Sequence, residues 1–382
     1  MDFAYTEEQK FFQKVVADMV EKVVEPKAEA LDESDDFDHD LFREVGGLGY
    51  YGLRYPEDVG GMDVDTQTFA IFIEEMAHGS FGFATAAMMQ CLMGTHFLHR
   101  FGSEDIIERL FKPAIRGEKI SCIAFTEETS GSDITGTRTI AKQDGDEWIL
   151  NGKKMWITNG PIADFVTVLA TTDPALKTKG LNFFLVEKGM EGFTYGQVLH
   201  KLGARGTVTG EIIFNDVRLP ADHLLGEEVN KGMEYMQEVL EEIRLMTAAL
   251  ALGLARAALE DAREYARVRE AFGKVIGKYQ LIRSKFGECW TEFEAAKLLV
   301  QKVAWMIQNK IPCGNEAAMA KMFATEMCLK AVDEATRIYG GNAFAQEYPV
   351  QRYFRDARFL LYGGGTHEVL KNFLGSRYIG RL

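Results

Sequence analysis

The sequence lacks the signatures of membrane-spanning, disulfide-linked and metal-binding proteins. No apolar run approaches the ~20 residues that a helix needs to span a bilayer. The N-terminal residues are acidic and polar where a signal peptide would be apolar. The 5 cysteines form no CxxC pair, and the 7 histidines show no metal-ligand spacing. We therefore expect a cytoplasmic protein with neither disulfides nor a bound metal.

Positive charge is also scarce. The chain has 43 Lys and Arg residues against 57 Asp and Glu residues, which gives a formal net charge of −14. This balance argues against nucleic-acid binding through a basic surface, because counterion release requires clustered cations. An anionic ligand would have to be bound by individual arginines.

The spacing of the apolar residues changes twice along the chain. Residues 1–118 show helical spacing, residues 119–228 contain short strand-like segments, and residues 229–382 are helical again. Within the middle segment, Asn151-Gly152 and Asn215-Asp216 predict turns. The order is therefore a helical domain, a small β domain and a helical bundle. The long C-terminal helices have more apolar residues than one face needs, which favours oligomerisation.

Five motifs follow one another in a fixed order. In that order they are Phe125–Asp133 (FTEETSGSD), Met155–Gly160 (MWITNG), Arg269–Lys274 (REAFGK) with Gln280, Arg337–Asn342 (RIYGGN), and Arg355–Arg358 (RDAR) followed by Gly364–Thr366. Together they resemble the acyl-CoA dehydrogenase family over essentially the whole chain, including members that act on cyclic acyl-CoA substrates.

The resemblance implies an α+β fold with three domains. These are an N-terminal helical domain (1–118), a middle β-barrel domain (119–228) and a C-terminal four-helix bundle (229–382). It also implies a homotetramer that binds FAD, oxidises an acyl-CoA substrate and passes electrons to an electron-transfer flavoprotein.

The predicted FAD contacts have a physical basis. Small and hydroxyl residues in Phe125–Asp133 allow backbone amides to approach a flavin edge or an anion, and Trp156 beside Thr158 offers a flat aromatic ring with a hydroxyl. By resemblance, Arg269 and Phe272 reach the FAD phosphate and adenine of a neighbouring subunit. The full predicted set is Phe125, Thr126, Ser132, Trp156, Thr158, Arg269, Phe272, Gln280, Arg337, Gly340, Gly341, Thr366 and Glu368.

Four residues match positions that bind the acyl-CoA substrate in the family. Glu241 and Arg244 lie in the segment that holds the CoA moiety, Ser132 lies in the loop between the flavin and the CoA pyrophosphate, and Gly365 follows the usual position of the base. The resemblance therefore predicts that Arg244 is a principal CoA ligand.

The residue that removes the substrate proton is missing. The family's reaction needs a carboxylate that takes the α proton while the β hydride goes to the flavin. Its glutamate usually precedes a Gly-Thr pair, where Gly364 stands here, or precedes the CoA-binding arginine, where Ile243 stands here. Cys91, in a pocket helix, and Glu242, one helical step or ~100° from Ile243, are the remaining candidates. The catalytic residue therefore stays unknown.

The loss of the base leaves several functions open. One is an unusual substrate, cyclic or already unsaturated, as in 1,4-dehydrogenation of cyclohex-1-ene-1-carboxyl-CoA. Another is a lyase of the acyl-CoA desulfinase type, although its expected arginine is absent from the pocket helix between Phe81 and His99. An ordinary α,β-dehydrogenase with a relocated base, a flavin monooxygenase and a non-catalytic FAD-binding scaffold are further alternatives.

Overall fold

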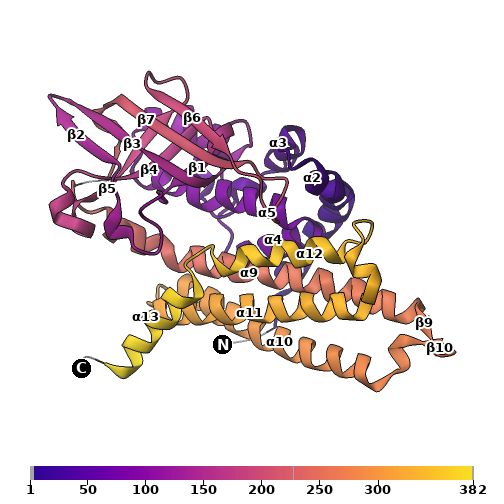
Figure 1. Ribbon diagram of the computed structural model, residues 1–382. Coiled ribbons are helices and arrows are strands. Elements are labelled where there is room, and N and C mark those ends of the chain that lie inside the picture. The colour runs from indigo at the N-terminus through magenta and orange to yellow at the C-terminus, as the bar shows by residue number, and fades with distance from the viewer. Residues whose placement is uncertain (1–3, 227, 381–382) are drawn as a thin grey trace.

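The computed structural model describes residues 4–226 and 228–380. Figure 1 shows a β-sheet region and a group of N-terminal helices, both resting on long C-terminal helices. Within the described residues, no helix combines the length and the apolar character that a membrane crossing requires.

Short helices make up the N-terminal part, and side-chain caps fix where several begin. Thr6 and Gln9 form a capping box at the first helix, and Asp65 and Ser80 accept backbone N–H groups at the starts of two others. The helices are α1 (Glu7–Met19), α2 (Ala28–Ser34), α3 (His39–Gly47), α4 (Thr66–Gly79), α5 (Phe81–Met88), α6 (His96–Phe101), α7 (Glu104–Ile106) and α8 (Lys112–Ile115), and a π-helical segment (Met89–Gly94) joins α5 to α6.

The middle part is one sheet in the order β6-β7-β3-β2-β4-β5-β8, with β1 added parallel to β4. β4 and β5 are apolar on both faces and almost fully buried, which places them at the centre of this part. The strands are β1 (Ser121–Ala124), β2 (Ile140–Asp144), β3 (Glu147–Thr158), β4 (Phe165–Thr171), β5 (Leu181–Glu187), β6 (Phe193–Val198), β7 (Thr209–Pro220) and β8 (Leu224–Leu225).

The closed barrel implied by the resemblance is wrong. β6 and β8 end the strand order, and no pairing among the described strands joins them. β8 has only 2 residues, and β2 meets β4 at the single pair Ile140–Thr171. Too few ladder groups are available for closure, so the sheet stays open.

The turns expected at Asn151-Gly152 and Asn215-Asp216 are also wrong. Both dipeptides lie inside long strands, β3 and β7, and face each other across a shift in register. Asn151 Nδ2 donates to Asp216 Oδ1 at 2.9 Å, and Asp216, at φ +50°, donates its N–H to Asn151 Oδ1 at 2.9 Å. The residues that favour turns form a β-bulge here, because bulges use the same backbone conformations.

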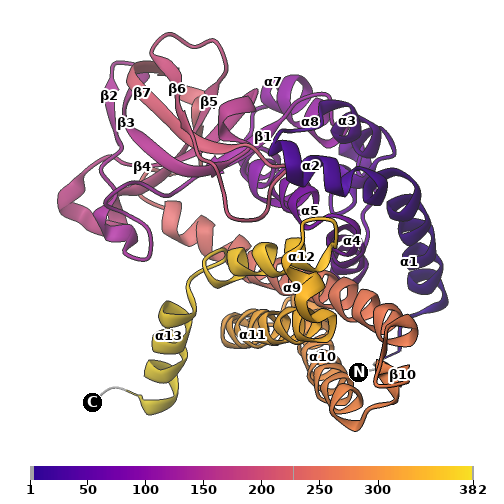
Figure 2. The ribbon, with the colours of Figure 1, turned by 45° about the vertical axis from the view of Figure 1, so that its right-hand side comes forward.

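Long helices make up most of the C-terminal part, and a glycine lets the first of them approach α4 closely. A Cβ at Gly253 would lie 2.1 Å from the carbonyl oxygen of Glu74, so only glycine allows the first of these helices to cross α4 there. The elements are α9 (Gly232–Val268), β9 (Glu270–Ala271), β10 (Lys274–Val275), α10 (Gln280–Gln308), α11 (Gly314–Tyr339), α12 (Val350–Ala357) and α13 (His367–Ile379). Figure 2 shows α13 leaving the bundle toward the C-terminus.

The Arg355–Arg358 motif joins the three parts of the chain. Arg355 forms a bidentate ion pair with Asp32 of α2, and Asp356 accepts the N–H of Ala204 at 2.7 Å. Asp356 is 3% exposed, and burial raises the pKa of its carboxyl to about 7. The motif is therefore structural, and it contains an acid whose ionisation opposes folding.

We expect Asp356→Asn to stabilise the protein above neutral pH. The amide keeps the acceptor for Ala204 but removes the buried charge. The folded pKa lies above the unfolded value of ~3.9, so wild-type stability falls as pH rises from ~4 to ~7, and the variant escapes this loss. The expected gain is about 2–4 kcal/mol at pH 8 and close to zero at pH 4. Thermal melting at both pH values measures it, with the exposed Asp40→Asn as control.

Candidate active site

A strained aromatic residue stands near the C-terminal end of β3. Trp156 has φ +60°, a rare conformation for a bulky residue, and its side chain is 55% exposed. The strand register between β3 and β7 shifts between Lys154 and Ile157, so this bulge turns the indole ring outward beside the half-buried Thr158. Strain that presents an aromatic face to solvent is typical of a binding site.

A buried ion pair fixes the loop next to this tryptophan. Lys154 has no exposed surface, and its Nζ donates to Glu127 Oε1 at 2.7 Å and to the carbonyl oxygen of Phe125 at 3.0 Å. Burial opposes ionisation of Glu127, but Lys154 and two backbone N–H groups outweigh it and hold the pKa of Glu127 below its usual value. The carbonyl of Thr126 accepts the N–H of Met155 at 2.9 Å. Residues 125–127 are thus held against β3.

The segment at the expected base position is built from glycines in left-handed conformations. Gly364 has φ +69° and Gly365 has φ +101°, and Lys321 Nζ donates to the carbonyl oxygen of Gly365 at 2.8 Å. A Cβ at position 364 would lie 3.0 Å from Thr247 Oγ1 of α9. Thr247 donates to the carbonyl of Ile243 at 2.8 Å, so position 364 meets the helix turn that carries the alternative base position.

None of the remaining candidates is free to act as a base. Glu242 forms a mostly buried ion pair with Arg54. Cys91 is fully buried, and burial raises the pKa of its thiol well above its usual value. His367, a further ionisable side chain beside the glycine segment, is hydrogen-bonded to Thr325 and Glu326. Both Cys91 and Glu242 are thus engaged or buried in this structure, and the identity of the base stays a prediction.

The predicted substrate ligands Glu241 and Arg244 have different surroundings. Glu241 accepts the N–H of Cys313 at 3.1 Å, at the start of α11, and is committed to that contact. Arg244 is half-buried with its guanidinium 5.6 Å from the ring centre of Phe373, and its Nε has no hydrogen-bond partner. Arg244 is therefore the better placed of the two to receive an anion. Ser132, by contrast, is exposed on its loop.

The other predicted cofactor contacts fall into two groups. Thr366 caps α13 and Glu368 lies exposed in its first turn, next to the glycine segment. The second group lies beyond the far end of α9, a 37-residue helix that spans about 55 Å. Figure 1 shows the β9–β10 hairpin projecting at that end, away from the sheet. The members of the second group are Arg269, Phe272, Gln280, Arg337, Gly340 and Gly341, all exposed.

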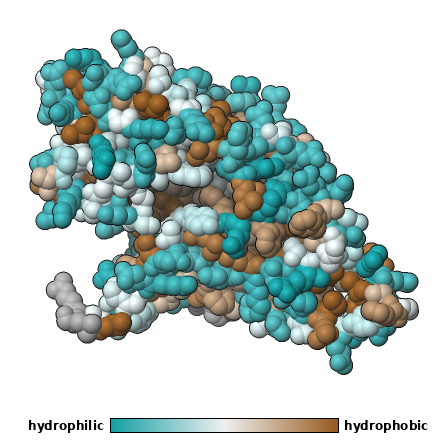
Figure 3. All heavy atoms as spheres, viewed as in Figure 1, coloured by the Kyte–Doolittle hydropathy of each residue, from teal (hydrophilic) through white to brown (hydrophobic). Residues whose placement is uncertain are grey.

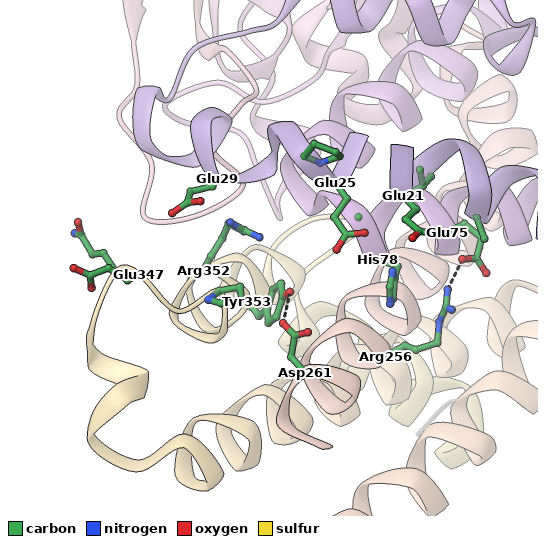
Figure 4. A pocket seen from close by; sticks show the side chains of 16 residues that line it. Glu21, Glu25, Glu29, Glu75, His78, Arg256, Asp261, Glu347, Arg352 and Tyr353 are labelled. Carbon is green, nitrogen blue, oxygen red and sulfur yellow. Dashed lines mark hydrogen bonds and ion pairs between the residues drawn. The ribbon is translucent and has the colours of Figure 1, made fainter. Parts of the chain in front are cut away.

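The surface of the described residues is hollowed at more than one place. Figure 3 shows a recess with apolar residues inside it, between the sheet and the C-terminal helices. A separate cleft of about 710 Å³ lies between the N-terminal helices and α12. Figure 4 shows that polar residues of this cleft pair with one another, Arg256 with Glu75 at 2.6 Å and Tyr353 with Asp261 at 2.8 Å. None of the residues that line this cleft belongs to the site described above.

Comparison with known families covers nearly the whole chain. The N-terminal, middle and C-terminal domain profiles of acyl-CoA dehydrogenases match residues 6–118, 122–217 and 230–379. This chain is a member of the acyl-CoA dehydrogenase family. Such enzymes are FAD-dependent oxidoreductases that act on CH–CH bonds of acyl-CoA thioesters, which confirms the predicted family, cofactor and reaction class.

Three relatives illustrate the range within the family. Benzylmalonyl-CoA dehydrogenase of Aromatoleum aromaticum is 45% identical over 97% of this acyl-CoA dehydrogenase and 98% of its own length. Butyryl-CoA dehydrogenase of Megasphaera elsdenii superposes with a TM-score of 0.96 at 35% identity and covers 100% of both chains. A chain from the structure of the electron transferring flavoprotein of Acidaminococcus fermentans also reaches 0.96, at 32% identity and 100% coverage of both chains.

Proposed function

We propose that this enzyme oxidises a benzylmalonyl-type acyl-CoA, in which a CH₂ group links the aryl ring to the α-carbon, and releases CO₂ from the carbon next to the thioester. The observation that carries the proposal is the glycine at position 364, whose Cβ site is bordered by Thr247 instead of a carboxylate. An α-carboxylated substrate needs no protein base, because loss of CO₂ creates the enolate that proton removal creates in other members. The 45% identity to a benzylmalonyl-CoA dehydrogenase supports this substrate class.

The electrons balance without a proton acceptor. The bond between the α-carbon and the carboxylate breaks, CO₂ leaves, and the electron pair stays as the thioester enolate. The enolate then forms the Cα–Cβ double bond as a hydride leaves the β-carbon, and FAD supplies the hydride acceptor. The products are CO₂, an α,β-unsaturated acyl-CoA and reduced flavin.

The chain's own residues fit a flavin beside the C-terminal end of β3. The indole of Trp156 is exposed and Thr158 offers a hydroxyl beside it, and the loop from Phe125 to Glu127 is held rigidly by Lys154. We assign the isoalloxazine ring to this face, with Thr366 and Glu368 closing it from α13. Exclusion of water from the adjoining apolar recess would favour decarboxylation, because a carboxylate is better solvated than CO₂.

Each flavin site would be completed by a second copy of the chain. Arg269 and Phe272 lie about 55 Å along α9 from the sheet, farther than one dinucleotide reaches. Phe272 is 97% exposed with φ +50°, so the hairpin presents it outward. The proposal includes a homotetramer with shared sites and an electron-transfer flavoprotein as the electron acceptor, in keeping with the similarity to a chain from such a flavoprotein's structure.

The other functions considered from the sequence have less support. 1,4-Dehydrogenation of cyclohex-1-ene-1-carboxyl-CoA would need a base in the pocket helix. In that helix, Cys91 is fully buried. Gln90, the polar residue next to it, is hydrogen-bonded to Ser121 and to two backbone carbonyls. An ordinary dehydrogenase with a relocated base would need Glu242, which is paired with Arg54.

The purified FAD-loaded enzyme tests the proposal. Under anaerobic conditions, ¹³C-carboxyl-labelled benzylmalonyl-CoA should bleach the flavin with one labelled CO₂ released per flavin. Deuterium at the β-carbon should slow bleaching and deuterium at the α-carbon should not. 3-Phenylpropionyl-CoA, which lacks the carboxylate, should react at least ~100-fold more slowly, because its proton has no base. Bleaching by 3-phenylpropionyl-CoA at a similar rate would disprove the proposal.

A further inference from the structure

A fully buried lysine lies behind the glycine segment without an acidic partner. Lys321 of α11 has no exposed surface, and its Nζ donates to the carbonyl oxygen of Gly365 at 2.8 Å. Among residues 4–226 and 228–380, no carboxylate oxygen lies within 4.0 Å of this Nζ. The other fully buried lysine, Lys154, does have such a partner, Glu127 at 2.7 Å. An unpaired buried cation is costly, so Lys321 calls for an explanation.

Arg244 is a second unpaired cation beside the same segment. No carboxylate of the described chain lies within 4.0 Å of its guanidinium, and its buried Nε has no partner. Three other largely buried arginines each hold one or two carboxylates: Arg54 pairs with Glu242, Arg256 with Glu74 and Glu75, and Arg355 with Asp32. Arg244 differs from these three, and it also differs from the half-buried Arg205, which donates to the backbone carbonyls of Lys201 and Asp32, because its buried Nε has no acceptor.

Both cations surround the place where the family's carboxylate is missing. Lys321 is bonded to Gly365, and Arg244 lies one helical turn before Thr247, which borders the Cβ site of Gly364. The two cations are close enough to influence each other: burial, and then the charge of Arg244, lowers the pKa of Lys321 to about 8, against the opposing effect of Glu326 and Glu368. Within this chain, position 364 supplies no negative charge to this place, whereas Arg244 and Lys321 supply two positive charges.

We propose that Arg244 and Lys321 form a subsite for the second carboxylate of the substrate, so that the substrate brings the negative charge that position 364 lacks. This inference rests on the proposed function. Arg244 is half-buried and can contact the carboxylate directly. Lys321 is sealed behind Gly365, so it is a positioning residue that holds the glycine segment and adds positive potential.

The subsite also serves the reaction after binding. When CO₂ leaves, the negative charge moves from the carboxylate to the thioester enolate and stays near the same two cations. Their attraction is therefore retained in the product of the first step, so the subsite contributes to substrate binding without making the enolate less stable relative to the bound carboxylate. A substrate without the carboxylate would leave both cations unpaired and would bind less well.

The test compares a carboxylated and a non-carboxylated ligand on the FAD-loaded enzyme. For Lys321→Met and, separately, for Arg244→Gln, we expect kcat/KM for benzylmalonyl-CoA to fall roughly 10- to 100-fold. The inhibition constant of 3-phenylpropionyl-CoA should change less than about 3-fold. Lys321→Arg should recover part of the loss, and the melting temperature of Lys321→Met should not fall, since a buried unpaired charge is removed.

Two outcomes separate the inference from the proposed function. If the wild-type enzyme releases no CO₂ from benzylmalonyl-CoA, the proposed function fails. If it does release CO₂, but the variants bind benzylmalonyl-CoA and 3-phenylpropionyl-CoA more weakly to the same extent, the subsite is overturned. Arg244 then acts as a general CoA ligand, and Lys321 has only a structural role.

Discussion

Two inactive variants are expected to restore activity when their chains are assembled together. Trp156→Ala removes the proposed flavin platform, and the double change Arg269→Ala and Phe272→Ala removes the contacts of the hairpin. Because α9, which is about 55 Å long, separates the hairpin from the sheet that carries Trp156, each site should draw these groups from different chains. In a pair made of one chain of each variant, one site contains all of the substitutions and the other site contains none.

Co-expression with two affinity tags and sequential purification would isolate the mixed oligomers. We expect each homo-oligomer to be nearly inactive and largely free of FAD, whereas the mixed oligomers should bind FAD at up to half of their sites and turn over accordingly. Mixed oligomers as inactive as their parents would contradict shared sites, because a site built from one chain cannot be repaired by another. Mixed oligomers of wild-type and Trp156→Ala chains provide the reference values of FAD content and turnover.

Periodicity predicted the order of the parts, because the switch from helical to strand-like spacing reflects which faces are buried. The same local reasoning failed at Asn151-Gly152 and Asn215-Asp216. Both dipeptides do adopt the positive-φ backbone that their composition favours, with Gly152 at +151° and Asp216 at +50°. Whether such a backbone reverses the chain or forms a bulge depends on the strand opposite, which the local sequence does not contain.

Distant partners explain why the site could be only partly predicted. The glycine at position 364 was visible in the motif, but the pairing of Glu242 with Arg54 joins residues 188 positions apart. Likewise, nothing in the sequence distinguishes Lys321, buried without an acid, from the other lysines of long helices. The one indication in the sequence is the glycine at position 364, where the family usually has a glutamate. Buried cations near such a position need another negative charge to neutralise them.

We expect Lys154→Met to cause the largest loss of stability among single changes at the site. Methionine fills the same space but leaves Glu127 buried without its cation, which typically costs about 3–5 kcal/mol. The carbonyl of Phe125 loses its donor as well, so the loop beside Trp156 should loosen and FAD should dissociate more readily. Thermal melting, and flavin content after gel filtration, measure the two effects separately.

The adjacent Lys153 provides a matched control. It pairs with Glu211 at 2.6 Å with its side chain half exposed, so Lys153→Met should cost less than about 1 kcal/mol and leave FAD bound. Adding Glu127→Gln to Lys154→Met removes the orphaned charge and should recover much of the stability, although the donor to Phe125 stays lost. If the double variant regains stability without regaining FAD, the ion pair has two separable roles, in folding and in shaping the flavin loop. Equal effects of Lys153→Met and Lys154→Met would contradict both, since burial is the property in which these neighbours differ most.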